Sequence, residues 1–271
     1  KAKEKNLSIV CGFCWRHHNQ RREAFKLVHD GAIGEITAVY TNYFTGPVKP
    51  MPPATERPAG ISDVDWQVRN WYNFAWISGD GLVEQAVHSI DKMCWVMKDV
   101  PPVSCVANGG RAVAANAGNI FDHISVYYKY ANGVFAHHGC RQIPGAWGQN
   151  ADFINGTKGR LIIGAGAVRI EGENAWRAKG AENDMYQQEH TELFASIRQG
   201  EGRNDGEWLA KSTLTAIMGR MAAYTGQEVT WEQALNSQHN LLPEGVTMDN
   251  LTWDQKLDHI PLAIPGRTKQ G

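Results

Sequence analysis

The stretch that organises the chain runs from Gly79 to Trp95 and reads GDGLVEQAVHSIDKMCW. Its apolar residues recur at steps of three and four positions, the spacing that places them on one face of a helix. Asp80 is the candidate N-cap, because its carboxylate can accept hydrogen bonds from the free amides of the first turn. The pattern therefore predicts one amphipathic helix over 79–95, with its apolar face on a hydrophobic core.

Three polar side chains border that apolar face. A step of about 100° per residue brings Glu84, His88 and Asp91 onto one stripe. The other polar residues are expected to point further out: Gln85, Ser89 and Lys92. A neighbouring carboxylate raises the pKa of an imidazole and partial burial lowers it, so a histidine balanced near neutrality suits proton transfer to or from a hydroxyl. The alternative is that Glu84 and His88, four residues apart, are only a helix-stabilising pair.

Residues 78–95, SGDGLVEQAVHSIDKMCW, resemble the segment GG-x-L-x-D-x-x-x-H-x-x-D-x-x-x-W of the Gfo/Idh/MocA family of sugar and polyol dehydrogenases. Here Glu84 replaces the usual aspartate, and Asp80 interrupts the usual glycine run. VCGFCWRHHNQRREAFKLVHDGAIGEI resembles the family's passage from its nucleotide domain to its substrate domain, and INGTKGRLII resembles its late sheet. The resemblance covers most of residues 7–235.

The resemblance implies the chemistry of the central stretch. In the family, the residues at Glu84 and His88 lie beside the nicotinamide of NAD or NADP and help to move the proton of a substrate hydroxyl. We therefore expect His88 to exchange that proton and Glu84 to orient and tune it, as the two catalytic residues. Asp91 is assigned to the substrate site, with support of the helix as its alternative role.

The N-terminal residues predict a piece of a doubly wound domain. An apolar run over 8–14 is typical of a buried parallel strand, and a helix over 19–29 and a strand over 35–45 follow it. Arg16 and His17 fall where the first strand ends, the usual place for ligand contacts in open α/β sheets, and are the candidate cofactor-binding residues. The alternative for both is a solvated loop.

These segments predict three parts of the chain. Residues 1–33 are expected to be a remnant of a dinucleotide-binding domain, 34–236 a substrate-binding and oligomerisation domain, and 237–271 an extended tail. The chain is therefore predicted to be the C-terminal part of a longer protein.

The sequence lacks the G-x-G-x-x-G motif that binds a dinucleotide at the start of a helix. The nearest match, Gly164-Ala165-Gly166, has no third glycine and leads into an apolar strand pattern, so it predicts a hairpin turn. The family's upstream catalytic lysine in its E-K-P setting also has no counterpart. We expect the chain to supply half of a dehydrogenase active site, with the NAD or NADP motif outside it.

Alternating and β-branched residues follow the central helix. They predict strands over 103–113, 121–130, 134–141, 150–156, 159–164 and 167–171. Short turns, among them Asn132-Gly133, make successive strands antiparallel. Two amphipathic helices are predicted over 185–198 and 206–224. The predicted fold class is α+β, an open, mainly antiparallel sheet with helices on one face.

The other face of that sheet must be either exposed to solvent or covered by another subunit. Since the family uses this face for oligomers, we predict a homo-oligomer through it. The apolar residues considered compatible with that interface are Phe121, Ile124, Val126, Tyr128 and Tyr130.

Residues 47–70 hold five of the eleven prolines and predict a long irregular loop, which in a compact protein is usually functional or disordered. Aromatic rings interleaved with polar groups follow it and suit a sugar, which has an apolar face and a rim of hydroxyls. We assign Arg69, Trp71 and Arg141 to substrate binding. The alternative is that the rings fasten the loop to the core.

Composition excludes several classes of protein. The formal net charge of −1 gives no electrostatic case for nucleic acid or an anionic membrane surface. No apolar run approaches the length of about 18 residues needed to span a bilayer, and the start KAKEKN is no signal peptide, so a cytoplasmic protein is predicted. Five cysteines argue against a disulfide framework, and the absence of H-x-x-x-H or H-E-x-x-H spacing argues against a metal site.

The predicted function is that of the substrate-binding, catalytic part of an NAD(P)-dependent oxidoreductase acting on a sugar, polyol or related hydroxy compound. Two alternatives stay open. One is an NAD-dependent glycosidase or lyase of the same family, and the other is a non-catalytic sugar-binding or assembly module.

Overall fold

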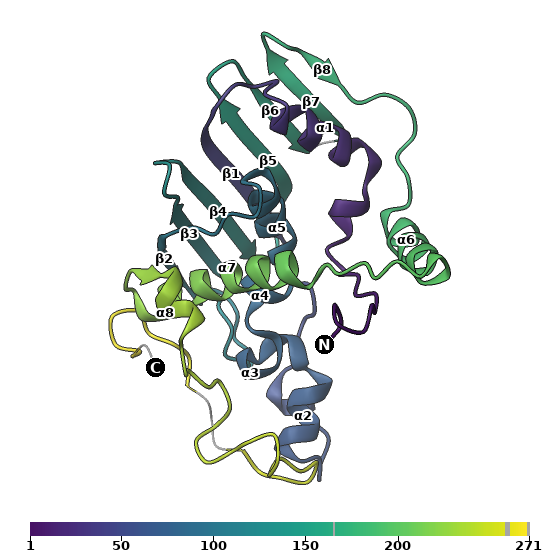
Figure 1. Ribbon diagram of the computed structural model, residues 1–271. Helices are drawn as coiled ribbons and strands as arrows, with labels where there is room; N and C mark the ends of the chain where they lie inside the picture. The colour runs from purple at the N-terminus through teal and green to yellow at the C-terminus, as the bar shows by residue number, and fades with distance from the viewer. Residues whose placement is uncertain (165, 258–260, 270–271) are drawn as a thin grey trace.

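The computed structural model describes residues 1–164, 166–257 and 261–269. Within them, nine strands form one sheet in the order β8-β7-β6-β5-β1-β4-β3-β2-β9 (Figure 1). Strand β1 runs parallel to β4, and every other neighbouring pair is antiparallel. The predicted α+β class with an open, mainly antiparallel sheet is confirmed.

The elements follow the predicted order closely. The strands are β1 Ile36–Thr45, β2 Ser104–Gly110, β3 His123–Lys129, β4 Phe135–Gln142, β5 Gln149–Gly156, β6 Gly159–Gly164, β7 Ala167–Gly172, β8 Trp176–Arg177 and β9 Val229–Thr230. The helices are η1 Cys14–His17, α1 Asn19–His29, η2 Ala54–Glu56, α2 Asp63–Arg69, η3 Trp71–Asn73, α3 Ala75–Ser78, α4 Gly81–Glu84, α5 Val87–Val96, α6 Met185–Gln199, α7 Gly206–Thr225 and α8 Trp231–Leu235. Among the described residues, no helix is both long and apolar enough to cross a membrane.

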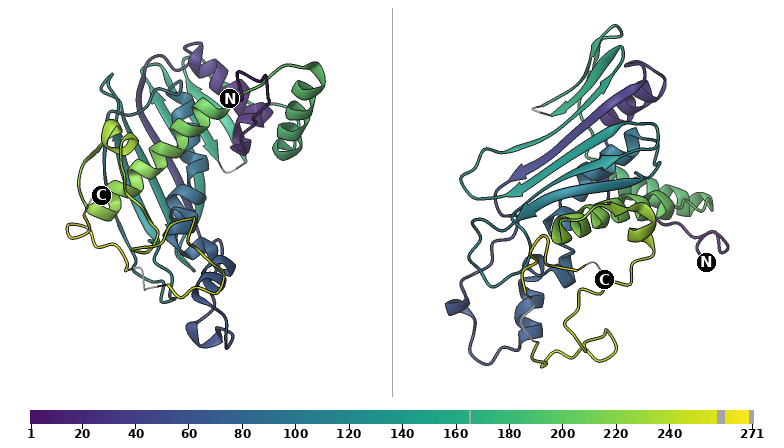
Figure 2. Two further views of the ribbon diagram at one scale, coloured as in Figure 1. Left: turned by 60° about the horizontal axis from the view of Figure 1, so that its bottom comes forward. Right: turned by 90° about the vertical axis from the view of Figure 1, so that its left-hand side faces the viewer.

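Helices α1, α5 and α7 cover one face of the sheet and leave the other face bare (Figure 2). The residues expected on the bare face are in fact buried on the covered one: Phe121, Ile124, Val126, Tyr128 and Tyr130. That prediction is wrong because successive residues of a strand point to opposite faces, and the more apolar set packs against the helices. On β3 the neighbouring set faces outward, with Tyr127 exposed by 51%.

The N-terminal strand predicted over 8–14 is absent from the described residues. Ile9 makes a single bridge to Asn204, and the chain then turns into η1. Cys11 and Phe13 are buried in the main core, so the apolar run is buried without strand pairing. Helix α1 packs on β6, β7 and α5 of the same layered structure. The described residues therefore show no separate remnant of a doubly wound domain.

The single helix predicted over 79–95 is two helices, α4 and α5. At the break, the amide of Ala86 donates to the carbonyl of Gly81 at 3.0 Å, five residues back instead of four. The side chain of Gln85 donates to the hydroxyl of Tyr43 at 2.6 Å and joins the break to β1. Because the helix is interrupted, the angular step used to align Glu84 with His88 does not continue across it.

Helix α5 is buried on nearly all sides rather than on one face. Ser89 and Lys92, expected to point outward, are exposed by 0% and 1%. The reason is that α5 lies between β1 and β4 on one side and α7, α1 and η1 on the others. A helix inside such a layer cannot keep a solvent face, whatever its sequence suggests.

Two further predictions need correction or restriction. The loop expected over 47–70 is irregular at its start but ends in α2, whose N-cap Ser62 accepts a hydrogen bond from the amide of Asp65 at 3.0 Å. After α8, no helix or strand occurs in the described part of the predicted tail. The tail contacts its own chain, since the amide of Leu257 donates to Asp63 at 3.0 Å.

Asp80 caps α4 as predicted, in an unusual backbone conformation. Its φ is +83° and its ψ 158°, a region that residues other than glycine rarely occupy. Its carboxylate accepts hydrogen bonds from the amides of Leu82 at 3.3 Å and Phe121 at 2.8 Å and from the hydroxyl of Tyr224 at 2.5 Å. These contacts hold the turn that leads into the candidate site.

This geometry predicts different effects for two substitutions of Asp80. Asp80→Ala removes the carboxylate and keeps the conformational strain, whereas Asp80→Gly removes both. We expect the glycine variant to be more stable than the alanine variant by about 1–2 kcal/mol, measured by urea unfolding. Equal stability of the two variants would mean that the backbone at 80 is not strained.

Candidate active site

His88 lies in the first turn of α5 and is half-buried. Its ring contacts Phe13 edge-on, with the ring centres 5.7 Å apart. Its Nδ1 is buried and has no hydrogen-bond partner among the described residues. Burial lowers the pKa of His88, and the nearby charge of Lys92 lowers it further. The imidazole is therefore neutral at pH 7 and can accept a proton.

Glu84 ends α4, just before the break. One of its carboxylate oxygens, Oε2, is buried without a hydrogen-bond partner in the described part of the chain, and burial raises the pKa of the group. Within that part it forms neither a hydrogen bond nor an ion pair with His88. The expected balance between a neighbouring carboxylate and partial burial is therefore decided by burial, since no acidic side chain among the described residues raises the pKa of His88.

Asp91 and Arg16 bind each other. The Arg16 guanidinium donates to both carboxylate oxygens of Asp91 at 2.8–3.0 Å and to Asp99 at 2.6 and 3.1 Å. It also lies 4.0 Å from the ring centre of Trp208. Asp91 is fully buried and accepts from Ser212 at 2.8 Å. Both side chains therefore join η1, α5 and α7, a structural use that differs from the predicted cofactor and substrate contacts.

His17 is also engaged inside the protein. It is 0% exposed, and its Nδ1 lies 2.9 Å from a carboxylate oxygen of Glu192 on α6. Arg22 and Arg203 bind the same carboxylate. Burial lowers the pKa of His17, and this effect exceeds the opposing charge of Glu192. The residue fastens η1 to α6.

The substrate-binding residues predicted by sequence do not converge on His88. Arg69 pairs with Asp65 at 2.8 Å on the surface of α2, and Trp71 packs edge-on against Tyr72. Arg141 lies on the bare face of the sheet, 5.0 Å from the ring centre of Phe44, and so across the sheet from the helix layer. Of the predicted set, Arg16 and Asp91 contact each other, and Glu84 and His88 lie on either side of the helix break without a hydrogen bond between them in the described part of the chain.

Lys92 and Asp152 form a buried ion pair that sequence reasoning missed. Their side chains are 1% and 0% exposed and meet at 2.6 Å. The Lys92 ammonium lies one helical turn after His88, 5.3 Å from the ring centre of Trp15 and 3.5 Å from Asn150. Burial lowers the pKa of Lys92 and raises that of Asp152, and the pairing opposes both shifts.

A cleft of about 440 Å³ opens next to this pair. Trp15 and Asn150, which contact Lys92, belong to its lining, together with Arg21, Glu182 and Tyr186. The Arg21 guanidinium lies 3.8 Å from the ring centre of Trp15, and its Nε has no partner in the described part of the chain. This mixture of ring faces and hydrogen-bonding groups is suited to a polar ligand such as a sugar.

Comparisons with known proteins show the family and the fold of the chain. A sequence model of the GFO/IDH/MocA C-terminal domain matches residues 21–162, just over half of the chain. The chain belongs to the Gfo/Idh/MocA family. No curated protein sequence matches it.

Solved structures resemble this family member in fold. Levoglucosan dehydrogenase in complex with NADH and levoglucosan has a TM-score of 0.65 at 15% identity, covering 84% of this chain and 67% of that one. A Sinorhizobium meliloti 1021 structure described as a myo-inositol dehydrogenase has a TM-score of 0.60 at 18% identity, with 84% and 67% covered. A Thermotoga maritima structure described as an oxidoreductase has a TM-score of 0.63 at 21% identity, with 82% and 63% covered. This chain thus spans about two thirds of the length of these structures.

Proposed function

We propose that this chain is the substrate-binding and catalytic part of an NAD(P)-dependent oxidoreductase that transfers hydride between a nicotinamide and a sugar, polyol or related hydroxy compound. The carrying observation is His88, a neutral imidazole with an unpartnered buried nitrogen among the described residues, in the family's characteristic segment. Family membership supports the class of reaction. The levoglucosan dehydrogenase complex with NADH and levoglucosan supports the cofactor and the class of substrate.

The described residues do not fit a complete site for the cofactor. No dinucleotide-binding glycine motif is present in the sequence, and Arg16 and His17 are held by acidic side chains. In the proposal, a nucleotide-binding half supplies the cofactor, and this chain supplies the proton acceptor. His88 accepts the proton of the substrate hydroxyl, and Glu84, with its unpartnered buried oxygen among the described residues, is the second catalytic residue.

Cofactor titration tests this division of labour. We expect the fluorescence of the ten tryptophans to be unchanged by NADH in the chain alone, and to change when the chain is joined to its nucleotide-binding half. The joined protein should form NADH from NAD⁺ with a sugar or polyol. Cleavage of a glycoside without net formation of NADH would indicate the glycosidase alternative. Sugar binding without cofactor binding would indicate the non-catalytic module.

The lowered pKa of His88 predicts the pH dependence of the joined enzyme. A base must be unprotonated, and the lowered pKa of His88 shifts its protonation to a lower pH than that of an ordinary histidine, 6.5. We expect the midpoint of the acid-side decline in kcat/KM for alcohol oxidation to lie below about pH 6.5. A decline centred at or above pH 6.5 would contradict the role of a buried, neutral His88.

We also propose that the bare face of the sheet forms a homo-oligomer. Tyr127 and Phe135 are exposed on it by 51% and 56% near the β3–β4 turn, and Trp147 is exposed by 65% beside Arg141, toward the other end of β4. Exposed aromatic side chains of this kind are typical of protein interfaces. We also propose a cytoplasmic location, which rests on the sequence alone.

A further inference from the structure

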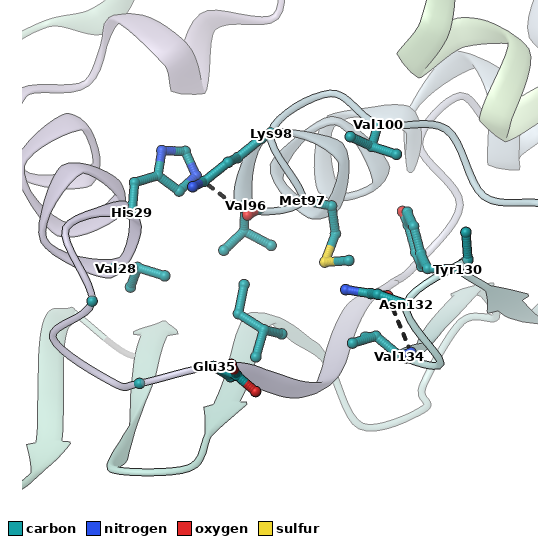
Figure 3. A pocket seen from close by; sticks show the side chains of 14 residues that line it. Val28, His29, Glu35, Val96, Met97, Lys98, Val100, Tyr130, Asn132 and Val134 are labelled. Atoms are coloured by element: carbon teal, nitrogen blue, oxygen red, sulfur yellow. Dashed lines mark hydrogen bonds between the residues drawn. The ribbon is translucent and has the colours of Figure 1, made fainter.

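A second pocket lies at the other end of α5. It has a volume of about 620 Å³ and is bounded by the C-terminal ends of α1 and α5, the start of β1 and the turn between β3 and β4 (Figure 3). His88 lies in the first turn of α5 and Met97 directly follows the helix, so the length of α5, about 15 Å, separates the two sites. The volume falls within the range of small-molecule sites. We name it the α5-end pocket.

The floor of the α5-end pocket is apolar. Val28 and Ile36 line it from α1 and β1, Val96 and Met97 from α5, and Val134 from the β3–β4 turn. Figure 3 shows the Met97 sulfur directed toward the middle of the pocket. A ligand with an apolar body would remove this surface from water.

One uncharged donor, the side-chain amide of Asn132, faces the pocket. The Tyr130 side chain forms part of the wall, and its hydroxyl is buried away from the open space. Asn132 accepts a hydrogen bond from the amide of Val134 through Oδ1 at 3.2 Å, which turns its nitrogen toward the pocket (Figure 3).

A strained turn places a cation at the rim. Lys98 and Asp99 have φ values of +57° and +56°, the left-handed region, although neither is glycine. Asp99 is held there by Arg16 and by its amide, which donates to the carbonyl of Cys94 at 2.8 Å. Lys98 forms no ion pair within the described ranges and lines the pocket. Strain of this kind is frequent at ligand sites.

We propose that the α5-end pocket binds a small organic anion, with an apolar body on the floor and a carboxylate or similar oxyanion toward Lys98. Two donors, on Lys98 and Asn132, line the pocket, and one acidic side chain, Glu35, lies on its opposite side (Figure 3). The cation of Lys98 and the amide of Asn132 favour a ligand that carries acceptor atoms. The proposal does not depend on the oxidoreductase activity.

A matched pair of probes tests the proposal. 1-Anilinonaphthalene-8-sulfonate carries the anion on an apolar body, and N-phenyl-1-naphthylamine is its neutral analogue. We expect the sulfonate to bind with one-to-one stoichiometry and to shift the methyl resonance of Met97 in methionine-labelled protein, leaving that of Met185 on α6 unmoved. An unmoved Met97 resonance at saturating probe would overturn the proposal.

Variants separate the apolar floor from the cation. Val100→Trp fills the pocket from a position that is 53% exposed, so folding should be preserved, and it should abolish binding of both probes. Lys98→Asn, a residue that tolerates the left-handed region, should weaken binding of the sulfonate about fivefold and leave the neutral probe unaffected. Lys179→Asn, outside the pocket, is the control and should change neither. Unchanged binding to Val100→Trp, or equal weakening of both probes by Lys98→Asn, would refute the assignment.

Discussion

Replacing His88 with alanine is expected to lower kcat for hydride transfer by about 10²–10⁴-fold in the enzyme joined to its nucleotide-binding half. The physical reason is the loss of a neutral, buried imidazole, the proposed acceptor of the substrate hydroxyl proton. KM should change little, because a proton acceptor contributes more to the transition state than to the bound substrate. Steady-state rates of NADH formation with saturating NAD⁺ and sugar or polyol measure the effect.

A control distinguishes this role from a structural one. His137 is half-buried like His88 but stacks on Tyr40, with ring centres 5.1 Å apart, on the other side of the sheet. His137→Ala should therefore leave kcat nearly unchanged. Added imidazole should restore part of the activity of His88→Ala, because it replaces the lost base without repairing packing. Near-normal turnover of His88→Ala would remove the residue from the proposed mechanism.

The sheet could be predicted because its signals are local. Alternation of side chains and the turn residues between strands depend on a few neighbouring positions, and the Asn132-Gly133 turn indeed joins β3 to β4. Helices α6 and α7 end at Gly200 and Gly226 in the left-handed conformation for the same reason. Which set of alternating residues faces the helices is not a local property, and that prediction failed on β3.

The central helix shows what local patterns cannot supply. The break before α5 is accompanied by a contact of Gln85 with Tyr43, a residue on a distant strand. Lys92 can be buried because its ammonium group forms an ion pair with Asp152 on β5. A charged residue one turn beyond a histidine gives no sign of burial until the layers around its helix are known.

The catalytic roles of Glu84 and His88 stay a prediction. Both were selected from their spacing and from the family resemblance of one short segment, and the break before α5 alters the geometry that the spacing implied. Arg141 was chosen without a spacing argument and lies on the bare face, whereas its neighbour Gln142 donates to the hydroxyl of Tyr72 in the helix layer. Phe13, which contacts His88, lies in an apolar run. Such a run predicts that its residues are buried, but it does not distinguish a strand from irregular chain.

The Lys92–Asp152 pair predicts the largest effect on stability. Lys92→Met leaves the Asp152 carboxylate buried without its cation, which is expected to lower the free energy of unfolding by about 3–5 kcal/mol at pH 7. The charge of Arg21, which also acts on Asp152, should moderate the loss. Urea unfolding at several pH values measures it. The double variant Lys92→Met, Asp152→Asn removes both charges and should recover most of the stability.

The two single variants should respond to pH in opposite directions. In Lys92→Met, the unpaired buried carboxyl has a raised pKa, so the folded state binds more protons than the unfolded state, and stability increases as the pH falls from 7 toward the carboxyl's unfolded value. In Asp152→Asn, the unpaired buried ammonium has a lowered pKa, so the folded state binds fewer protons and stability increases as the pH rises. Parallel pH profiles for wild type and both variants would contradict the burial of this ion pair. They would show that water reaches both charges and therefore enters the helix layer behind His88.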